Sequence, residues 1–217
     1  MKTLKGRTSP VKTGLPLIQI AKELGHHAPF TIFGAATGIV IMLLTVLFQV
    51  PPSASYSVFY FLHPLHVVLS ALVTSAIYLK YSRKPWMVIW IGYVGSVGIA
   101  TMSDVVIPYL GGTLLNLEIE FHLPFLEKWW LVNPLALLGI VIGCWKRVTR
   151  LPHSGHVLLS TWASLFYFTA FGVGEWLSLL PAIFLFLFLS VWLPCCLSDI
   201  VFPLLFISSA EDKHKHE

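Results

Sequence analysis

The sequence predicts an all-α integral membrane protein of six transmembrane helices, built as an inverted repeat of three helices followed by three. The first supporting observation is composition, since 56% of the 217 residues are hydrophobic and 11% are charged, whereas charged residues make up about 25% of a soluble domain. The second is that the apolar residues form continuous runs of roughly 17 to 22 residues, close to the ~20 that a helix needs to cross a bilayer. Such runs lack the alternating pattern of a membrane-spanning strand.

The six predicted helices divide equally between the two halves of the chain. They cover residues 30–50, 58–79, 85–104, 129–145, 157–173 and 177–197. The first half is residues 1–110, and it begins with an interfacial segment that Pro29 separates from the first spanning helix. The second half is residues 111–217, which ends in a cytoplasmic tail. Because three is an odd number, the second half enters the membrane from the opposite side, as in many transporters.

Three short motifs recur in the same order in both halves. They read Glu-x-x-x-His-x-Pro-Phe, His-x-x-His-Val-x-Leu-Ser and Ser-Asp-x-Val-x-Pro. Their copies begin at Glu23 and Glu118, at His63 and His153, and at Ser103 and Ser198. Three matches in register indicate a duplicated structural unit.

Basic residues predict the orientation, since Lys and Arg are enriched in cytoplasmic loops. They concentrate in the N-terminal segment, the second and fourth connections and the tail. The opposite side has Lys128 as its one basic residue, together with four glutamates, Glu118, Glu120, Glu127 and Glu175. Both termini are therefore expected in the cytoplasm, in a protein of the cell membrane or inner membrane. The asymmetry accounts for the net charge of +4 without a nucleic-acid partner.

The repeated motifs predict two metal sites, one on each face of the membrane. Residues three or four apart lie on one face of a helix, so each His-x-x-His or Glu-x-x-x-His pair can aim two donors at one point. In the predicted topology each face collects three His and two carboxylates from both halves. The outer set is His63, His66, Asp104, Glu118 and His122, and the inner set is Glu23, His27, His153, His156 and Asp199.

Several nearby residues are secondary candidates. His26 and Glu120 have no counterpart in the repeat. Ser70 and Ser160 follow the second His of each pair by four residues; they can support a ligand, although a hydrogen bond to a carbonyl of their own helix is the simpler expectation.

Two residues near helix ends carry further expectations. Asp104 is predicted at the end of the third helix, where the helix dipole disfavours a carboxylate, so we expect a His or a cation beside it. Cys195 and Cys196 can reach the inner site, while apolar packing is the usual role of such cysteines.

The donor types restrict the metal. Imidazole with carboxylate suits Zn, Fe(II), Mn or Co better than Cu(I), Mg or Ca, and Zn or Fe is the expected cofactor. Haem is the main competitor, but two His three residues apart on one helix are poorly placed for axial ligation on facing helices. An interfacial polar role is the simplest alternative for any one His pair, whereas recurrence of ionisable groups at membrane depth is typical of functional sites.

These observations favour a divalent metal transporter or channel, because both faces keep a full donor set. Its partners would be the bilayer and the metal ion, and a homo-oligomer is compatible with the sequence. The alternative is an intramembrane metal-dependent hydrolase or oxidoreductase acting on a lipid-borne substrate, which needs one site only. A third alternative is a structural role for the metals. The sequence contains no Walker loop, Rossmann fingerprint, Gly-x-Ser-x-Gly or His-Glu-x-x-His motif, which argues against ATP-driven or soluble-type hydrolase mechanisms.

Overall fold

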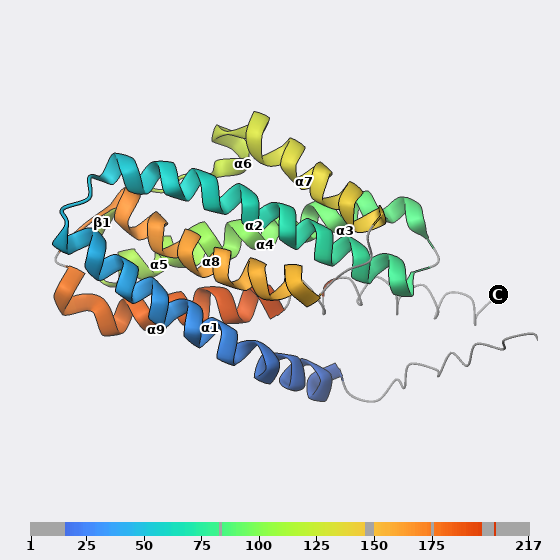
Figure 1. Cartoon of the computed structure of the whole chain (residues 1–217), viewed down its shortest axis with the longest axis horizontal. Helices are drawn as coiled ribbons and strands as arrows, with labels where there is room; N and C mark the ends of the chain where they lie inside the picture. Colours follow the sequence, from blue (N-terminus) through green and yellow to red (C-terminus); the bar gives the residue numbers. More distant parts are fainter. Residues whose placement is uncertain (1–15, 83, 146–149, 175, 197–201, 203–217) are drawn as a thin grey trace, which may run out of the picture.

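The computed structural model describes residues 16–82, 84–145, 150–174, 176–196 and 202. The described chain is mostly helical and forms an elongated bundle, in which the long helices run along one axis and successive ones alternate in direction (Figure 1). Helix α1 begins, and helix α9 ends, toward the same end of this bundle (Figure 1). The chain therefore crosses the length of the bundle repeatedly, as the apolar segments predict.

Helices α1 (Pro16–Leu47) and α2 (Pro52–Tyr81) form an antiparallel pair. The predicted separation at Pro29 is wrong, because α1 continues through this residue. A proline removes one backbone hydrogen bond of the helix. This loss does not end α1, because the apolar stretch from Ala28 to Leu47 continues as helix on both sides of Pro29. At the start of α2, Pro52 occupies the first turn, where the missing N–H has no helical partner to lose.

The third long segment, Pro85–Leu114, is a nearly continuous helix with two wider turns. Its elements are η1 (Pro85–Met87), α3 (Val88–Tyr93), the π-helical η2 (Val94–Gly98), α4 (Ile99–Thr101), the π-helical η3 (Met102–Val106) and α5 (Ile107–Leu114). The predicted end of this helix at residue 104 is wrong, because the helix continues for ten more residues, to Leu114. Pro108 lies just after η3, and a π-helical irregularity of this kind accommodates a residue without an N–H.

The second half of the chain begins with an irregular connection and then forms three further helices. Strand β1 (Glu118–Ile119) pairs antiparallel with β2 (Gly172–Val173). The short helix α6 (Pro124–Glu127) leads into α7 (Trp129–Trp145), which is followed by α8 (Arg150–Phe171) and α9 (Trp176–Cys196). The connection turns back along the bundle, because Tyr60, within α2, donates a hydrogen bond to Glu127 at the end of α6.

Helix α2 is the centre of the bundle and packs mainly against α8 and α7. Two glycines of α7 permit the close approach. A Cβ atom at Gly139 would clash with the carbonyl oxygen of Val68, and one at Gly143 would clash with that of Leu72. Small residues are typical at such helix contacts in membrane proteins.

Four helical segments are long and apolar enough to cross a membrane. Among the described residues they are Ala28–Leu47, Pro52–Lys80, Pro85–Leu114 and Leu177–Cys195. Many large apolar side chains on the bundle surface are exposed, including Phe33, Trp90 and Val141, as expected of a surface that faces lipid. The described part of the chain is thus suited to membrane integration through four candidate helices, and the six-helix inverted repeat stays a prediction.

Helices α7 and α8 are not among the four candidate membrane spans, and their length and composition explain why. Helix α7 is apolar but has 17 residues, slightly short for a ~30 Å hydrocarbon core. Helix α8 carries a buried row of polar side chains, His156, Ser160, Thr161 and Ser164, which lowers its hydropathy. This row forms one side of the candidate site.

Candidate metal centre

The fully buried Asp104 is the centre of a polar network between α2, η3 and α8. Its Oδ2 atom lies 2.9 Å from Nδ1 of His63 and 2.8 Å from Nδ1 of His66. Its Oδ1 atom accepts hydrogen bonds of 2.7 Å from the hydroxyls of Ser103 and Ser160. Burial of a charge is costly unless hydrogen bonds replace its hydration. Here both carboxylate oxygens are doubly hydrogen-bonded, and the expected His partner of Asp104 is confirmed.

Local backbone geometry brings these groups together. His63 and His66 are one turn apart on α2, so they face the same carboxylate. Ser103 and Asp104 are adjacent in the chain, yet both are fully buried. They lie in η3, and a π-helical turn, which is wider than an α-helical one, is frequent at functional sites.

The carboxylate also determines the tautomers of the two His rings. An ionised Asp104 can only accept hydrogen bonds, so both Nδ1 atoms must donate. In a neutral ring with its proton on Nδ1, the Nε2 atom carries a lone pair. The Nε2 atom of His63 is buried and has no hydrogen-bond partner among the described residues, while the ring of His66 faces α8.

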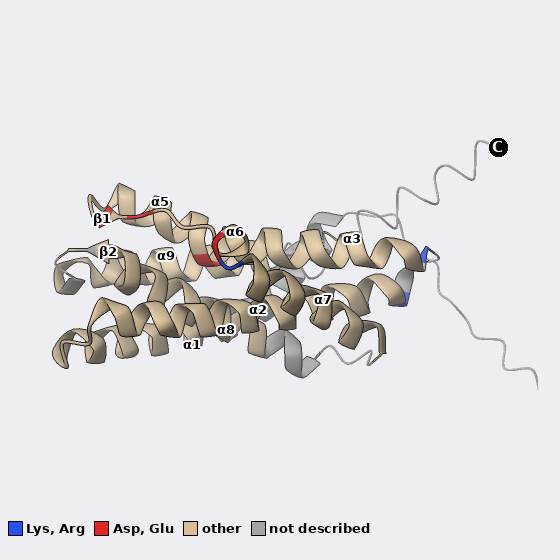
Figure 2. Ribbon diagram, turned by 90° about the horizontal axis from the view of Figure 1, so that it is seen from above, with Lys and Arg blue, Asp and Glu red and all other residues tan. Residues whose placement is uncertain are grey.

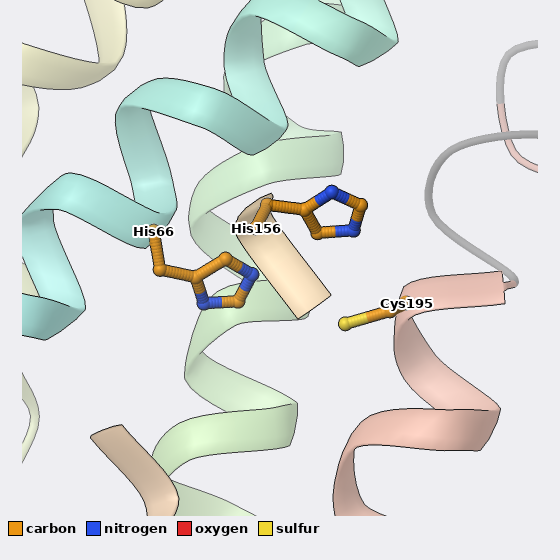
Figure 3. Close-up of side chains that lie close together, drawn as sticks. All are labelled: His66, His156 and Cys195. Atoms are coloured by element: carbon orange, nitrogen blue, oxygen red, sulfur yellow. The ribbon is translucent and has the colours of Figure 1, made fainter. Parts of the chain in front are cut away.

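His66, His156 and Cys195 form the strongest candidate ligand set among the described residues. One ligand atom from each lies within 4.8 Å of the others. Their exposed fractions are 1%, 0% and 2%. The two imidazoles are stacked, with ring centroids 5.7 Å apart and an interplanar angle of 9°, and the Cys195 side chain points toward them (Figure 3).

Two imidazoles and one thiolate suit a zinc-class ion. Tetrahedral zinc has Zn–N distances of about 2.0–2.1 Å and Zn–S distances near 2.3 Å, so its ligand atoms are roughly 3.5 Å apart. Since the donor atoms lie within 4.8 Å of one another, each pair would have to move closer together by about 1.3 Å at most. His66 has an orienting carboxylate on its other nitrogen, which is the usual second interaction of a metal-bound His.

The grouping of these residues differs from the two predicted faces. The sequence places His66 in the outer set and His156 in the inner set, whereas their rings are adjacent. The reason is helix length. His63 and His66 lie 11 and 14 residues after the start of α2 at Pro52, which is about 17 and 21 Å along the helix axis. They therefore lie near the middle of the bundle rather than at its outer end.

His122 belongs to a separate, partly exposed cluster. Its Nδ1 lies 3.0 Å from Glu127 Oε1, and its Nε2 lies 3.3 Å from Glu120 Oε2. Tyr60 donates a 2.8 Å hydrogen bond to Glu127, and Tyr167 donates one to the carbonyl oxygen of Glu120. We call these five residues the His122 cluster. Partial burial raises the pKa of Glu127, but hydrogen bonds from Tyr60, the Leu123 N–H and His122 outweigh it, so its pKa is lower than usual.

The remaining predicted residues have other positions. Glu118 is exposed and pairs with Val173 in the small sheet, apart from His122. Ser70 is buried within α2. The side chains of Glu23, His26, His27 and His153, like the whole of Asp199, lie outside the described part of the chain.

Three further contacts of the two clusters were not the leading expectation from the sequence. Ser160 binds Asp104 rather than a carbonyl of its own helix. The Ser164 hydroxyl lies 2.9 Å from the backbone carbonyl oxygen of Ser103 and 2.8 Å from that of Ser160, and the first of these contacts joins α8 to η3. Glu127 follows His122 by five residues, a spacing that predicts no contact within a helix, so the sequence offers no signal for this pair.

No protein-family model, curated protein or solved structure matches this chain. The functional assignment therefore depends on the site itself.

Proposed function

We propose that this chain is an integral membrane protein that binds one divalent transition metal ion of the Zn or Fe(II) class in the centre of its helical bundle. The observation that carries this proposal is the convergence of His66, His156 and Cys195, from three different helices, within 4.8 Å. The hydrogen bond from His66 to Asp104 supports it, because such a contact orients a ligand and raises its basicity. The cysteine shifts the preference toward zinc.

The geometry best supports a catalytic use of the metal. A metal held by His66, His156 and Cys195 would have three protein ligands, as in catalytic zinc sites, and would supply an activated water for hydrolysis. Asp104 is held by four hydrogen bonds and in turn fixes His66, which favours retention of the ion over its release. A site enclosed by membrane helices would act on a lipid-borne substrate, and hydrolysis is the reaction class that such a water performs.

Transport of the metal is the second candidate, and a specific observation favours it. His66 comes from the first half of the chain, whereas His156 and Cys195 come from the second. Transporters with inverted repeats bind their substrate near the middle of the membrane, between the repeats. We propose for this case that α7 and α8 also insert, so that α1, α2 and Pro85–Leu114 form one unit and α7, α8 and α9 form the other.

The same proposal places both termini in the cytoplasm. Its support is the distribution of charge in Figure 2, where basic residues lie at the end of the bundle at which α2 leads into α3, while acidic residues lie near β1 and α6, with one basic residue, Lys128, directly after α6. Lys80 lies in the last turn of α2, Lys84 follows this helix, and positive residues flank the cytoplasmic ends of membrane helices. Labelling of an introduced cysteine near Asn116 from the outside would agree with this orientation, and labelling from the cytoplasmic side alone would refute it.

Metal analysis of the purified protein tests the central claim. We expect one zinc or iron per chain, lost in His66→Ala and His156→Ala and much reduced in Cys195→Ser. Cys144→Ser is the matched control, because this cysteine is exposed on α7. A protein without metal, or equal metal content in the two cysteine variants, would refute the proposed site.

Proteoliposomes distinguish the two uses of the metal. Uptake of Zn, Fe(II), Mn or Co into vesicles, lost in His156→Ala, would support transport. Retention of one ion without uptake would favour an enzyme. A structural role would be indicated if metal removal lowered thermal stability while no phospholipid or ester substrate was hydrolysed by the metal-bound protein.

A further inference from the structure

A cleft on the side of the bundle lies outside the metal centre and the His122 cluster. Its volume is about 270 Å³, and it is open to the surroundings. The lining residues come from the third long segment and from α6: Tyr93, Val94, Val97, Gly98, Thr101 and Phe125. Its size is slightly below the roughly 300–1,000 Å³ of pockets for drug-sized ligands, so it suits one narrow chain.

The cleft is apolar because its few polar groups are already bonded. The hydroxyl of Thr101 donates to the Val97 carbonyl oxygen at 2.7 Å, which leaves its methyl group for the cleft. The Tyr93 hydroxyl donates to Asn133 at 3.0 Å. No strong hydrogen-bonding side chain of the lining therefore remains for a polar ligand.

The backbone keeps this space open. Val94, Val97 and Gly98 belong to the π-helical turn η2, and a Cβ atom at Gly98 would meet nothing within 4 Å. The surrounding segment is one of the four that can span a membrane. An open apolar cleft on such a helix faces hydrocarbon, so the fitting occupant is an acyl chain.

The short helix α6, which contributes Phe125 to the cleft, is followed directly by a basic residue. Phe125 lines the cleft, and Lys128 follows it by three residues, directly after α6. The Lys128 Nζ atom lies 5.5 Å from the ring centroid of Tyr60 and 5.9 Å from that of Tyr56. It forms no ion pair with the acidic residues in the described part of the chain. Its neighbour Glu127 is engaged by His122 and Tyr60 instead.

We infer that the cleft and Lys128 form a binding site for one glycerophospholipid, with an acyl chain in the cleft and the phosphate at Lys128. A Lys side chain at the edge of the membrane can extend its ammonium group to the interface, where lipid phosphates lie, and Lys is a common phosphate ligand. The site is separate from the metal centre. None of the residues that line the cleft is a candidate metal ligand, although Val97 packs in one cluster with Val67, the residue after His66.

Native mass spectrometry of the protein, released from nanodiscs of mixed phosphatidylcholine and phosphatidylglycerol, tests this inference. The wild type should retain one phospholipid. Gly98→Leu fills the cleft and should lower the occupancy by a factor of about ten or more, since loss of two buried methylene groups already has that effect. Gly25→Leu is the matched control, because Gly25 also has open space around it.

Lys128→Gln should weaken retention of phospholipid but not of diacylglycerol. Lys84 is an exposed lysine in the connection between α2 and η1, and Lys84→Gln should change neither. If Gly98→Leu fails to fold, Val94→Trp at the rim replaces it, with circular dichroism as the check of folding. Equal lipid occupancy in the wild type and the filled-cleft variant would overturn the inference, and so would equal retention of both lipids by Lys128→Gln. Metal content should be the same in all of these variants, so failure of the lipid site and failure of the metal site are distinguishable.

Discussion

Replacement of Asp104 by Asn tests the core of the site while keeping its shape. The carboxylate accepts two hydrogen bonds on each oxygen. An amide has one accepting oxygen and one donating NH₂ group, so one pair of donors must face another donor. If the oxygen remains with the two serines, the NH₂ group faces Nδ1 of His63 and His66.

The expected loss of stability in Asp104→Asn follows from the number of hydrogen bonds lost. Hydrogen bonds to charged groups contribute about 1.5–3 kcal/mol each, so two lost bonds cost about 3–6 kcal/mol. This is a large share of the ~5–15 kcal/mol stability of a typical protein. His66 can recover a hydrogen bond by moving its proton to Nε2, but it then loses the lone pair that binds the metal. We therefore expect metal affinity to fall by about 10- to 100-fold, as for other changes behind a metal-bound His.

Two measurements check this expectation. Competition with a chelator gives the zinc affinity, and thermal unfolding in detergent gives the loss of stability. Ser103→Ala is the control, since it removes one of the four hydrogen bonds and leaves the charge and both His tautomers in place. Wild-type zinc affinity and unfolding temperature in Asp104→Asn would refute the reasoning.

Three further predictions concern stability. Ser160→Ala should lower the unfolding temperature through loss of one bond to the carboxylate, about 1.5–3 kcal/mol, while metal content stays unchanged; loss of the metal would make Ser160 part of the coordination instead. Gly143→Ala should destabilise the protein by about 1–3 kcal/mol, since its Cβ would meet the Leu72 backbone. Gly98→Ala should instead raise the stability, because it replaces a helical glycine that has open space around it. Equal unfolding temperatures of the two variants would contradict this prediction. The low pKa of Glu127 implies a stabilising contribution that is full above about pH 4.5 and lost as the pH falls through the folded-state value. The difference in stability between the wild type and Glu127→Gln should therefore shrink under acidic conditions, and a pH-independent difference would exclude this contribution.

Much of the architecture could be predicted from the sequence, because hydrophobic runs specify helices directly. The His-x-x-His spacing also predicts that His63 and His66 face one point, and both contact Asp104. The error lay in the helix ends. Composition does not show that α2 begins at Pro52 rather than near residue 58, or that the third segment continues to Leu114. These longer helices move the His pair and Asp104 from one face of the membrane to the middle of the bundle.

Other parts of the site depend on tertiary structure alone. The sequence contains the repeated Ser-Asp pair but not the π-helical turn that buries both residues. Cys195 carries no signal that separates a ligand from a packing residue, since it also lies against Val157 and Val191. The contact between His122 and Glu127 depends on the path of the irregular connection, which no periodic pattern describes.

The two π-helical turns have a consequence for how this helix can change during evolution. A π-helical turn holds one residue more than an α-helical turn, so each acts as a single-residue insertion absorbed within the helix. An α-helix advances by about 100° per residue, so deletion of one residue from Met102–Val106 would rotate one flank of the segment against the other by about that angle. Asp104 could then no longer face α2 and α8 while Gly111 faces α9. Substitutions can therefore be tolerated along this segment where a change in length cannot.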